Sequence, residues 1–546
     1  MKAVTGHKKV VFLIGFVLLF FASSITSFAQ TRGGHLVYGT QQAPDTLDAG
    51  AGGRDVVFAI AWNYLDPLIR TRPDDPKYYP GLAEKWTVSS DARVYTFHLR
   101  KDVKFHDGTP LTAEAVKFSI DRIMDPGTGA KAARYAVGPF ERCEIVDSHT
   151  VKICFNRPYG SFFRMVSTVY VPIVSPAAVE RHGDEYGFNV TGTGPFVLEE
   201  YVPGDRATFV KNKDYTWGPE WTHSGPAFLD RVTYRFIPED IIRVGSLRTG
   251  ETNLIDGIRS DQIYRVVRDR KLKIGVSGAG GAPWMLILNT GEFPTDDRAV
   301  RQAISYAIDR DALIQKLYRG TNKPAYSPLE KSTPGYDPGI DRLSVYDQKR
   351  AKAVLEKDGW AASSDKNHPD VNRPSGSRVK ENKGLVVELG IPEEHLEQQL
   401  EQQLELAKAI GSQLKEVGIE IVIKTFDSGT AFQVPTVRDH NMTLCSSFWP
   451  DPQLLEHWFS LDPIGELGRG RYANPKLDDL LSEAERTADL EKRAEIYARV
   501  QDFLIIDAVC IPLIGKAYVL GMKKEIEGIT FSISGYPVFY ETFFSK

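Results

Sequence analysis

The length, composition and charge of the chain place it among ordinary globular proteins. It has 546 residues, of which 42% are hydrophobic and 25% are charged, which is enough apolar material for sizeable cores. The formal net charge is −4, so we exclude nucleic acid as a partner, because no basic excess favours it. At roughly 150 residues per domain, the length predicts three or four domains or two large lobes.

The first 29 residues are typical of a secretory signal peptide. Three lysines precede the apolar run 10–22, and Ser27 and Ala29 are small residues at the spacing of a cleavage site. The run is shorter than the ~20 residues that span a bilayer as a helix. We therefore expect cleavage after Ala29 and a periplasmic protein; the alternative is an uncleaved N-terminal anchor. No cysteine stands at the junction, so we do not expect a lipid anchor.

The first half of the chain predicts paired strands and the helix that follows them. Residues 82–105 alternate apolar and polar side chains around a polar turn, which is typical of a β-hairpin. Thr112 can cap the next helix, because its hydroxyl can accept from a free amide of the first turn. Residues 191–201 form a glycine-rich turn that enters a strand, 231–237 predict another strand, and 239–249 predict a helix.

Four cysteines bear on the redox state of the chain. Cys143 and Cys154 flank a segment that predicts a hairpin with a polar turn, so they could face each other across two strands, and an oxidising compartment permits disulfides. We therefore predict a Cys143–Cys154 bridge, with buried free thiols as the alternative, because sequence alone does not fix connectivity. No C-x-x-C pair is present, which argues against a redox or zinc site.

The second half of the chain begins with the glycine-rich joint 277–284, followed by an apolar strand. The clearest helix covers 296–320, with Asp296 or Asp297 as its cap and Gly320 at its end. Further helices are predicted at 347–358, 393–418 and, as a pair, 476–507, and a polar surface loop at 361–384. The repeat EQQLEQQL in 393–418 is too short for a coiled coil and favours an ordinary surface helix. Strands and helices alternate throughout, which predicts α/β lobes.

Several blocks of the sequence resemble one known family. The strongest is LAEKWTVSSDARVYTFHLRKDVKFHDGTPLTAEAVKFSIDRI at 82–123; supporting blocks are GTGPF at 192–196, LNTGEFPTDDRAVRQAISYAIDRDALI at 288–314, and WPDP at 449–452. Together they resemble the extracytoplasmic solute-binding proteins of ABC importers, of the dipeptide/oligopeptide type (solute-binding protein family 5). Within the first block, His106, Asp107 and Gly108 favour a turn before a capped helix over an acid–base pair.

The resemblance implies an α/β, two-lobed periplasmic-binding-protein-like fold with a hinge and an additional inserted domain. The implied boundaries are 1–29 for the signal peptide, 30–56, 178–284 and 516–546 for lobe I, 57–177 for the inserted domain, and 285–515 for lobe II. The joint 277–284 and the segment near Gly515 then become the two hinge crossings. Closure of such lobes around a ligand is a recognised mechanism, and it buries the ligand between domains.

The resemblance also directs attention to the residues before Asp451. In peptide-binding members of the family, a carboxylate three residues before this Asp pairs with the peptide's ammonium. Here that position is Phe448, and its neighbours Ser446, Ser447 and Trp449 offer no carboxylate either. We therefore expect Phe448 and Trp449 to stack on a ligand face or hold a cation over a ring; the alternative is that both pack into lobe II.

A second candidate stretch is Gly53-Arg54-Asp55, which resembles the cleft-lining loop after the first strand in the family. Arg54 could hold a ligand carboxylate in a bidentate fork, and Asp55 could take the ammonium from the other lobe. The alternatives are a solvated surface pair or an internal salt bridge. We expect residues 62–64 in the core of the inserted domain, whereas Trp284 could face either the cleft or the core.

These observations predict a binding protein that captures a peptide or peptide-like solute and delivers it to permease subunits in the inner membrane, working as a monomer without a cofactor. An oligosaccharide or an opine-like solute is the alternative cargo. A metal site is not expected, because His440 and His457 lack ligand spacing. An exported hydrolase is disfavoured, because G-x-S-x-G, H-E-x-x-H and P-loop motifs are absent; a sensor or chaperone could use the same fold.

Overall fold

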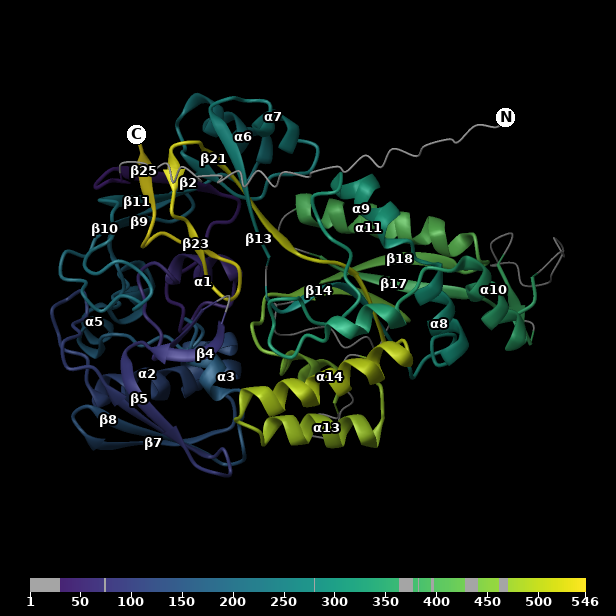
Figure 1. The fold of residues 1–546 in the computed structure, drawn as a ribbon, viewed down its shortest axis with the longest axis horizontal. Helices are drawn as coiled ribbons and strands as arrows, with labels where there is room; N and C mark the ends of the chain where they lie inside the picture. Colours follow the sequence, from purple (N-terminus) through teal and green to yellow (C-terminus); the bar gives the residue numbers. More distant parts are fainter. Residues whose placement is uncertain are drawn as a thin grey trace, which may run out of the picture.

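The protein is described from a computed structural model, in which residues 30–72, 75–278, 280–362, 377–381, 383–393, 397–427, 440–460 and 470–546 are placed. The predicted signal peptide and most of the predicted loop 361–384 lie outside the described residues. The strands form three larger sheets of seven, five and four strands, together with small two- and three-stranded ribbons. Figure 1 shows the seven- and four-stranded sheets at one end of the molecule and the five-stranded sheet at the other.

The seven-stranded sheet contains strands from near both termini, β2 and β21. Its order is β13-β21-β12-β2-β11-β10-β9, and β2 runs parallel to both β11 and β12. The strand bounds are β2 His35–Thr40, β9 Phe196–Val202, β10 Arg206–Lys211, β11 Arg231–Phe236, β12 Leu254–Ile255, β13 Leu272–Gly278 and β21 Ala517–Lys523. Helix α6, Asp240–Thr249, packs on β2, β12 and β21. The strands predicted at 191–201 and 231–237 and the helix predicted at 239–249 are confirmed.

The four-stranded sheet has the order β5-β6-β8-β7 and is covered by helix α2, Ala113–Met124. Its strands are β5 Ala83–Val88, β6 Val94–Leu99, β7 Phe140–Asp147 and β8 Thr150–Phe155. The predicted hairpin is confirmed, with Trp86 opposite Phe97. The predicted cap is also confirmed: the Thr112 hydroxyl accepts from the amide of Ala115 at 3.3 Å. The strands all fall within the range predicted for the inserted domain.

The predicted Cys143–Cys154 bridge is wrong for this structure, in which both residues are free thiols. The hairpin itself is present, but its register sets Cys143 opposite Ile153 and Cys154 opposite Arg142. Residues opposite each other share one face of a sheet, and neighbours along a strand alternate faces. The two thiols therefore point to opposite faces, although both are buried.

The five-stranded sheet has the order β18-β17-β19-β14-β20. Its strands are β14 Ala282–Leu288, β17 Val386–Glu393, β18 Glu420–Asp427, β19 Met442–Ser447 and β20 Cys510–Ile514. Its helices include α8 Arg298–Ala307, α9 Arg310–Tyr318, α10 Gln348–Lys357, α11 Glu397–Lys415, α12 Leu454–Phe459, α13 Pro475–Glu485 and α14 Leu490–Ile506. Helix α11 packs on β17 and β18, and α8 packs on α10. The helices predicted at 347–358, 393–418 and 476–507 are confirmed.

The single helix predicted over 296–320 is wrong, because the chain forms two helices there, α8 and α9. Asp297 caps the first by accepting from the Ala299 amide at 2.8 Å. Asp309 caps the second by accepting from the Ala312 amide at 2.9 Å, and Ile308 before it is extended. Apolar residues keep their helical spacing on both sides of the break, so this spacing alone did not reveal the break.

The remaining elements connect these sheets. The short strands are β1 Gln30–Thr31, β3 Ile69–Arg72, β4 Asp75–Pro80, β15 Val379–Lys380, β16 Lys383–Gly384, β22 Ile526–Glu527, β23 Thr530–Phe531, β24 Pro537–Val538 and β25 Phe543–Ser545; the other helices are α1 Asp55–Ala61, α3 Lys131–Val137, α4 Phe162–Met165, α5 Pro176–His182 and α7 Ile263–Val267. Among the helices of the described residues, none is long and apolar enough to cross a membrane.

The chain passes twice between the seven- and five-stranded sheets. One passage joins β13 to β14, and the other joins β20 to β21 (Figure 1). The segment between α9 and α10 bonds to both passages: the Glu330 amide donates to the Gly281 carbonyl at 2.8 Å, and the Gly515 amide donates to the Lys323 carbonyl at 2.8 Å. Both passages lie where the sequence predicted hinge crossings, and Lys516 of the second one lines the cavity described below.

His106 has the structural role that the sequence favoured. Its ring accepts from the Gly192 amide at 3.2 Å and donates to the Gly194 carbonyl at 3.0 Å. Burial lowers the pKa of His106 to about 4, so the imidazole is neutral and its two nitrogens can take these opposite roles. The adjacent Asp107 accepts from Thr109 and Ser175. The pair therefore ties two turns together and is not arranged for acid–base chemistry.

Gly192 in this turn has no room for a side chain, since a Cβ there would lie 2.0 Å from the Tyr64 carbonyl oxygen. We expect Gly192→Ala to lower the free energy of unfolding by about 1–3 kcal/mol, because backbone would have to move. Gly245 in α6 is the matched control, since a Cβ there meets nothing within 4 Å. Gly245→Ala should raise stability by up to ~1 kcal/mol through helix propensity. Urea unfolding of both variants tests this, and equal effects would contradict it.

Candidate ligand cavity

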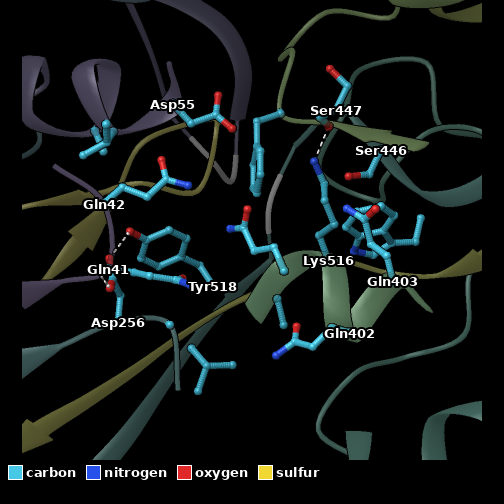
Figure 2. Close-up of a pocket in the computed structure, with 18 of the residues that line it drawn as sticks. Gln41, Gln42, Asp55, Asp256, Gln402, Gln403, Ser446, Ser447, Lys516 and Tyr518 are labelled. Atoms are coloured by element: carbon cyan, nitrogen blue, oxygen red, sulfur yellow. Dashed lines mark hydrogen bonds between the residues drawn. The ribbon is translucent and has the colours of Figure 1, made fainter. Parts of the chain in front are cut away.

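A cavity of about 1230 Å³ lies between the seven-stranded and five-stranded sheets. It is lined from one side by the segment after β2 and the start of α1, and from the other by α11 and the segment after β19. Figure 2 shows Gln41, Gln42 and Asp55 across the cavity from Ser446 and Gln403. The space exceeds the 300–1,000 Å³ of ordinary small-molecule pockets, so it can hold a ligand larger than one amino acid.

All of the residues predicted to bind a ligand line this cavity: Gly53, Arg54, Asp55, Ser446, Ser447, Phe448 and Trp449. The structure thus brings together two stretches almost 400 positions apart in the sequence. Trp284 also lines the cavity. Asn63 and Tyr64 are buried and Trp62 is half-buried, but Asn63 donates to Tyr234 of β11 at 2.9 Å and Tyr64 stacks on Phe209 of β10, so these two residues pack on the seven-stranded sheet and not in a core of their own domain. Whether any of the lining residues contacts a ligand remains a prediction.

Arg54 is engaged by its own loop. Its Nη1 donates to the Ala43 carbonyl at 3.2 Å and lies 3.5 Å from the carboxylate of Asp45. The side chain of Asp45 is 85% exposed, so this ion pair is a weak surface contact. Arg54 is thus paired at the surface, as one alternative had it, but with Asp45 and not with the neighbouring Asp55. A bidentate grip on a ligand would require the guanidinium to leave this position.

Asp55 presents an accessible carboxylate at the N-terminus of α1. Its side chain is exposed, but only toward the cavity, because protein surrounds it on the other sides. Burial raises the pKa of Asp55, against the lowering effects of the Tyr536 hydroxyl and of Lys516. The Tyr536 hydroxyl lies near the carboxylate and stabilises its charged form as a weak donor. Lys516 acts on Asp55 only at a distance, so the cationic group of a ligand could still pair with this carboxylate.

The two aromatic residues that follow Ser447 differ in their surroundings. Trp449 is only 4% exposed, and its ring packs against Tyr135 at 4.8 Å and Tyr170 at 5.0 Å between centroids. Trp449 therefore packs into the protein, but against residues of the range 57–177 and not into lobe II as the alternative had it. Phe448 is half-buried and has Tyr536 at 5.8 Å on one side, so neither ring offers a broad open face.

Asp451 has the structural role that we expected for it. It is fully buried, and its carboxylate accepts two hydrogen bonds from the Arg493 guanidinium, at 2.6 and 2.8 Å. The Ser161 hydroxyl also donates to Asp451, at 3.2 Å. Because Ser161 comes from the first half of the chain, this cluster ties that half to Asp451 and to Arg493 of α14. A carboxylate so fully engaged is not available to a ligand.

The sequence reasoning missed several lining residues. Lys516 at the second passage lies with its ammonium 3.5 Å from the centroid of the Phe448 ring and donates to the Ser447 carbonyl (Figure 2). Helix α11, expected to be an ordinary surface helix, lines the cavity with Gln399, Gln402 and Gln403. Their spacing of three and four residues, which places them on one helix face, was the available signal. No spacing or motif in the sequence around Lys516 indicated that its side chain would reach the cavity.

On the seven-stranded side, Asp256 differs from Asp55 in that its carboxylate is satisfied within the protein. Asp256 accepts from the hydroxyls of Tyr38, Thr40 and Tyr518 and from the Gln41 amide, at 2.7 to 3.0 Å. It therefore holds this wall in shape. In the part of the chain that the structure describes, no group of His, Cys, Asp and Glu side chains could hold a metal ion.

Comparison with known proteins identifies this arrangement. Residues 77–464 match the model of bacterial extracellular solute-binding proteins, family 5. A similar curated protein is the probable D,D-dipeptide-binding periplasmic protein DdpA of Escherichia coli, 27% identical over 91% of each chain. Two similar solved structures cover 94% of this chain and 99% of their own, each at 24% identity: DppA of Helicobacter pylori with the peptide STSA, TM-score 0.73, and AgaA of A. tumefaciens R10 with agropinic acid, TM-score 0.71.

The fold and the cavity between its sheets are those of a two-lobed periplasmic binding protein, which confirms the predicted α/β fold class. The chain belongs to family 5 of the bacterial extracellular solute-binding proteins. Members of this family are the binding components of ABC transporters and not enzymes, so the predicted transport role is confirmed by membership. The identity of the solute does not follow from membership.

Proposed function

We propose that the protein binds a short peptide or peptide-like solute in this cavity and delivers it to ABC permease subunits. The observation that carries the proposal is Asp55, an accessible carboxylate that can pair with an ammonium group from the wall opposite Ser446. A charge-assisted hydrogen bond in a site closed to water is strong. Asp55 would thus take the role of the carboxylate that peptide-binding members of the family have at the position of Phe448. DdpA and DppA, whose names and complexes concern peptides, support this solute class.

Binding is proposed to occur by closure of two lobes. Lobe I would comprise 30–56, 178–284 and 516–546, lobe II 285–515, and the inserted domain 57–177. The passages at β13–β14 and β20–β21 would act as hinges, since they are the links between the two sheets that wall the cavity. A ligand that shifts the closed state from 1:99 to 99:1 must favour it by roughly 5.5 kcal/mol. Contacts with both walls could supply that.

The proposed setting is the periplasm. Cleavage after Ala29 would release a mature monomer without a lipid anchor, which would carry solute to the membrane permease. Mass spectrometry of the exported protein tests the cleavage site, since it reports the mass of the mature N-terminus. Analytical ultracentrifugation of the ligand-bound protein tests the monomeric state, since it measures the mass of the particle in solution.

A second cargo class is supported by two observations. Phe448 stands where peptide-binding relatives of the family have a carboxylate, and AgaA, with the same fold, binds agropinic acid. A solute without a free ammonium, such as an opine-like conjugate, would not need that carboxylate. In this case Asp55 would accept from neutral donors of the solute instead.

The deciding experiment is mass spectrometry of the small molecules released when the purified mature protein is denatured. Tightly bound cargo stabilises the native state and can survive purification. We expect peptides with free N-termini. N-blocked conjugates or sugars would support the second class and refute an ammonium site at Asp55. If nothing is released, fluorescence titration with D-alanyl-D-alanine and Ser-Thr-Ser-Ala provides the same decision, because the protein either binds them or does not.

A further inference from the structure

Lys516 is a buried lysine whose ammonium reaches the wall of the cavity. The residue is only 7% exposed, and it stands at the passage between β20 and β21. Its backbone amide donates to the Glu330 carboxylate at 2.6 Å. Its ammonium donates to the Ser447 carbonyl and lies 3.5 Å from the centroid of the Phe448 ring. The bond to Glu330 thus fixes the backbone of Lys516, and the Ser447 carbonyl and the Phe448 ring fix its ammonium.

The charge on Lys516 is incompletely compensated. Two carboxylates act on it, Glu330 and Asp55, but both act at a distance, without a side-chain hydrogen bond to the ammonium among the described residues. The contacts of the ammonium with the end of β19 and the residue after it are the Ser447 carbonyl and the Phe448 ring, and neither carries a charge. Burial lowers the pKa of Lys516 to about 7 and raises the pKa of Glu330 to about 6. A buried charge without a contacting counter-charge is costly.

We propose that Lys516 anchors a carboxylate of the solute, so that the cargo is an acid whose carboxylate lies against the Phe448 wall of the cavity. The inference rests on the proposed function, because it requires a solute in the cavity. A carboxylate monoanion suits the position better than a phosphate dianion, since Asp55 and Glu330 would repel the second charge. Lys516 is better placed than Arg54, whose Nη1 already bonds to its own loop.

The anchor makes ligand binding dependent on pH in one direction. A carboxylate next to the ammonium stabilises its protonated form, so binding takes up a proton whenever free Lys516 is partly neutral. With a pKa of about 7, the uptake at pH 7 is about half a proton per ligand. Affinity then falls as the pH rises above 7, by at most about tenfold per unit. Below pH 6 the uptake vanishes.

Calorimetry with matched peptides tests the anchor. The probes are D-alanyl-D-alanine and Ser-Thr-Ser-Ala, each as the free acid and as the C-terminal amide, titrated at pH 7 in phosphate and in Tris to measure proton uptake. We expect the acids to bind at least tenfold more tightly than the amides, with about half a proton taken up. Lys516→Met should abolish both effects, Lys516→Arg should keep the preference for the acid without the uptake, and Lys524→Met, an exposed lysine away from the cavity, should change neither.

The possible results separate this inference from the proposed function. Equal binding of acids and amides, or a preference that survives in Lys516→Met, overturns the anchor and leaves peptide binding intact. If no peptide binds, the carbon-13 signal of the Lys516 ε-carbon, assigned by its loss in Lys516→Met, is titrated with pH in the absence and presence of acetate. A titration midpoint raised by acetate supports the anion site while peptide binding fails; an unchanged midpoint overturns both.

Discussion

Replacing Asp451 by alanine will lower the free energy of unfolding by about 3–5 kcal/mol, the cost of breaking a buried ion pair from one side. The side chains of Asp451 and Arg493 are 1% and 3% exposed, and two hydrogen bonds join them. Alanine leaves the guanidinium buried, with the hydroxyls of Ser161 and Tyr497 as its remaining hydrogen-bond partners among the described residues. Urea-induced unfolding, followed by tryptophan fluorescence, measures the loss.

Two controls show whether the loss comes from the unpaired charge. The double variant Asp451→Ala/Arg493→Met removes both charges and should recover much of the stability, because no charge then remains buried without a partner. Asp102→Ala breaks an ion pair with Arg100 whose carboxylate is 54% exposed, and it should cost less than about 1 kcal/mol. A loss below 1 kcal/mol in Asp451→Ala would contradict a structural role for the buried pair.

The sequence predicted local elements well where the signal was itself local. Alternation and a polar turn sufficed for the hairpin of β5 and β6, and a hydroxyl at the right position sufficed for the cap of α2. The break between α8 and α9 was missed although Asp309 offers a local cap, because the apolar period runs across it and a second part of its stabilisation is not local. Gln413 of α11 accepts from the Asp309 amide at 2.9 Å and donates to its carbonyl at 3.1 Å, and no pattern in 296–320 contains that contact.

The two cysteines show a different limit of sequence reasoning. A hairpin and two cysteines at a plausible spacing predicted a bridge, but a shift of one residue in strand register decides which face each side chain takes. The register is fixed by packing: Ile153 and Cys143 share the buried face beneath α2. Packing of this kind depends on the whole domain, so the spacing of cysteines in the sequence did not reveal it.

The candidate site was predicted in part for the same reason. The two stretches that line the cavity, around Asp55 and around Phe448, were found because motifs of a known family mark them. Lys516 belongs to no such motif. Its properties arise from Ser447, Phe448 and Glu330, which are distant from it in sequence and meet it only where the chain passes between the sheets. The burial of a lysine and its contacts depend on the tertiary structure, so they could not be predicted from the local sequence.

Asp55→Asn will weaken the binding of peptides with free N-termini by about 10- to 150-fold, the equivalent of the ~1.5–3 kcal/mol of a hydrogen bond to a charged group. The variant keeps the shape of the side chain and removes the charge that would pair with the ammonium. The measurement compares Ser-Thr-Ser-Ala with its N-acetylated form by calorimetry. The parent should prefer the free amine by this factor, and the variant should lose that preference while binding the acetylated peptide as before.

The pH dependence of binding distinguishes Asp55 from any other carboxylate of the cavity. Burial raises the pKa of Asp55 in the free protein, so on acidification the carboxylate is neutralised at a higher pH than an exposed Asp, and affinity for the free amine falls there. Asp55→Asn should remove this acid limb. Asp214→Asn, an exposed residue outside the cavity, removes the same charge and should change neither affinity nor its pH profile. A parent that binds free and acetylated peptides equally would show that the ammonium is not what this wall of the cavity recognises.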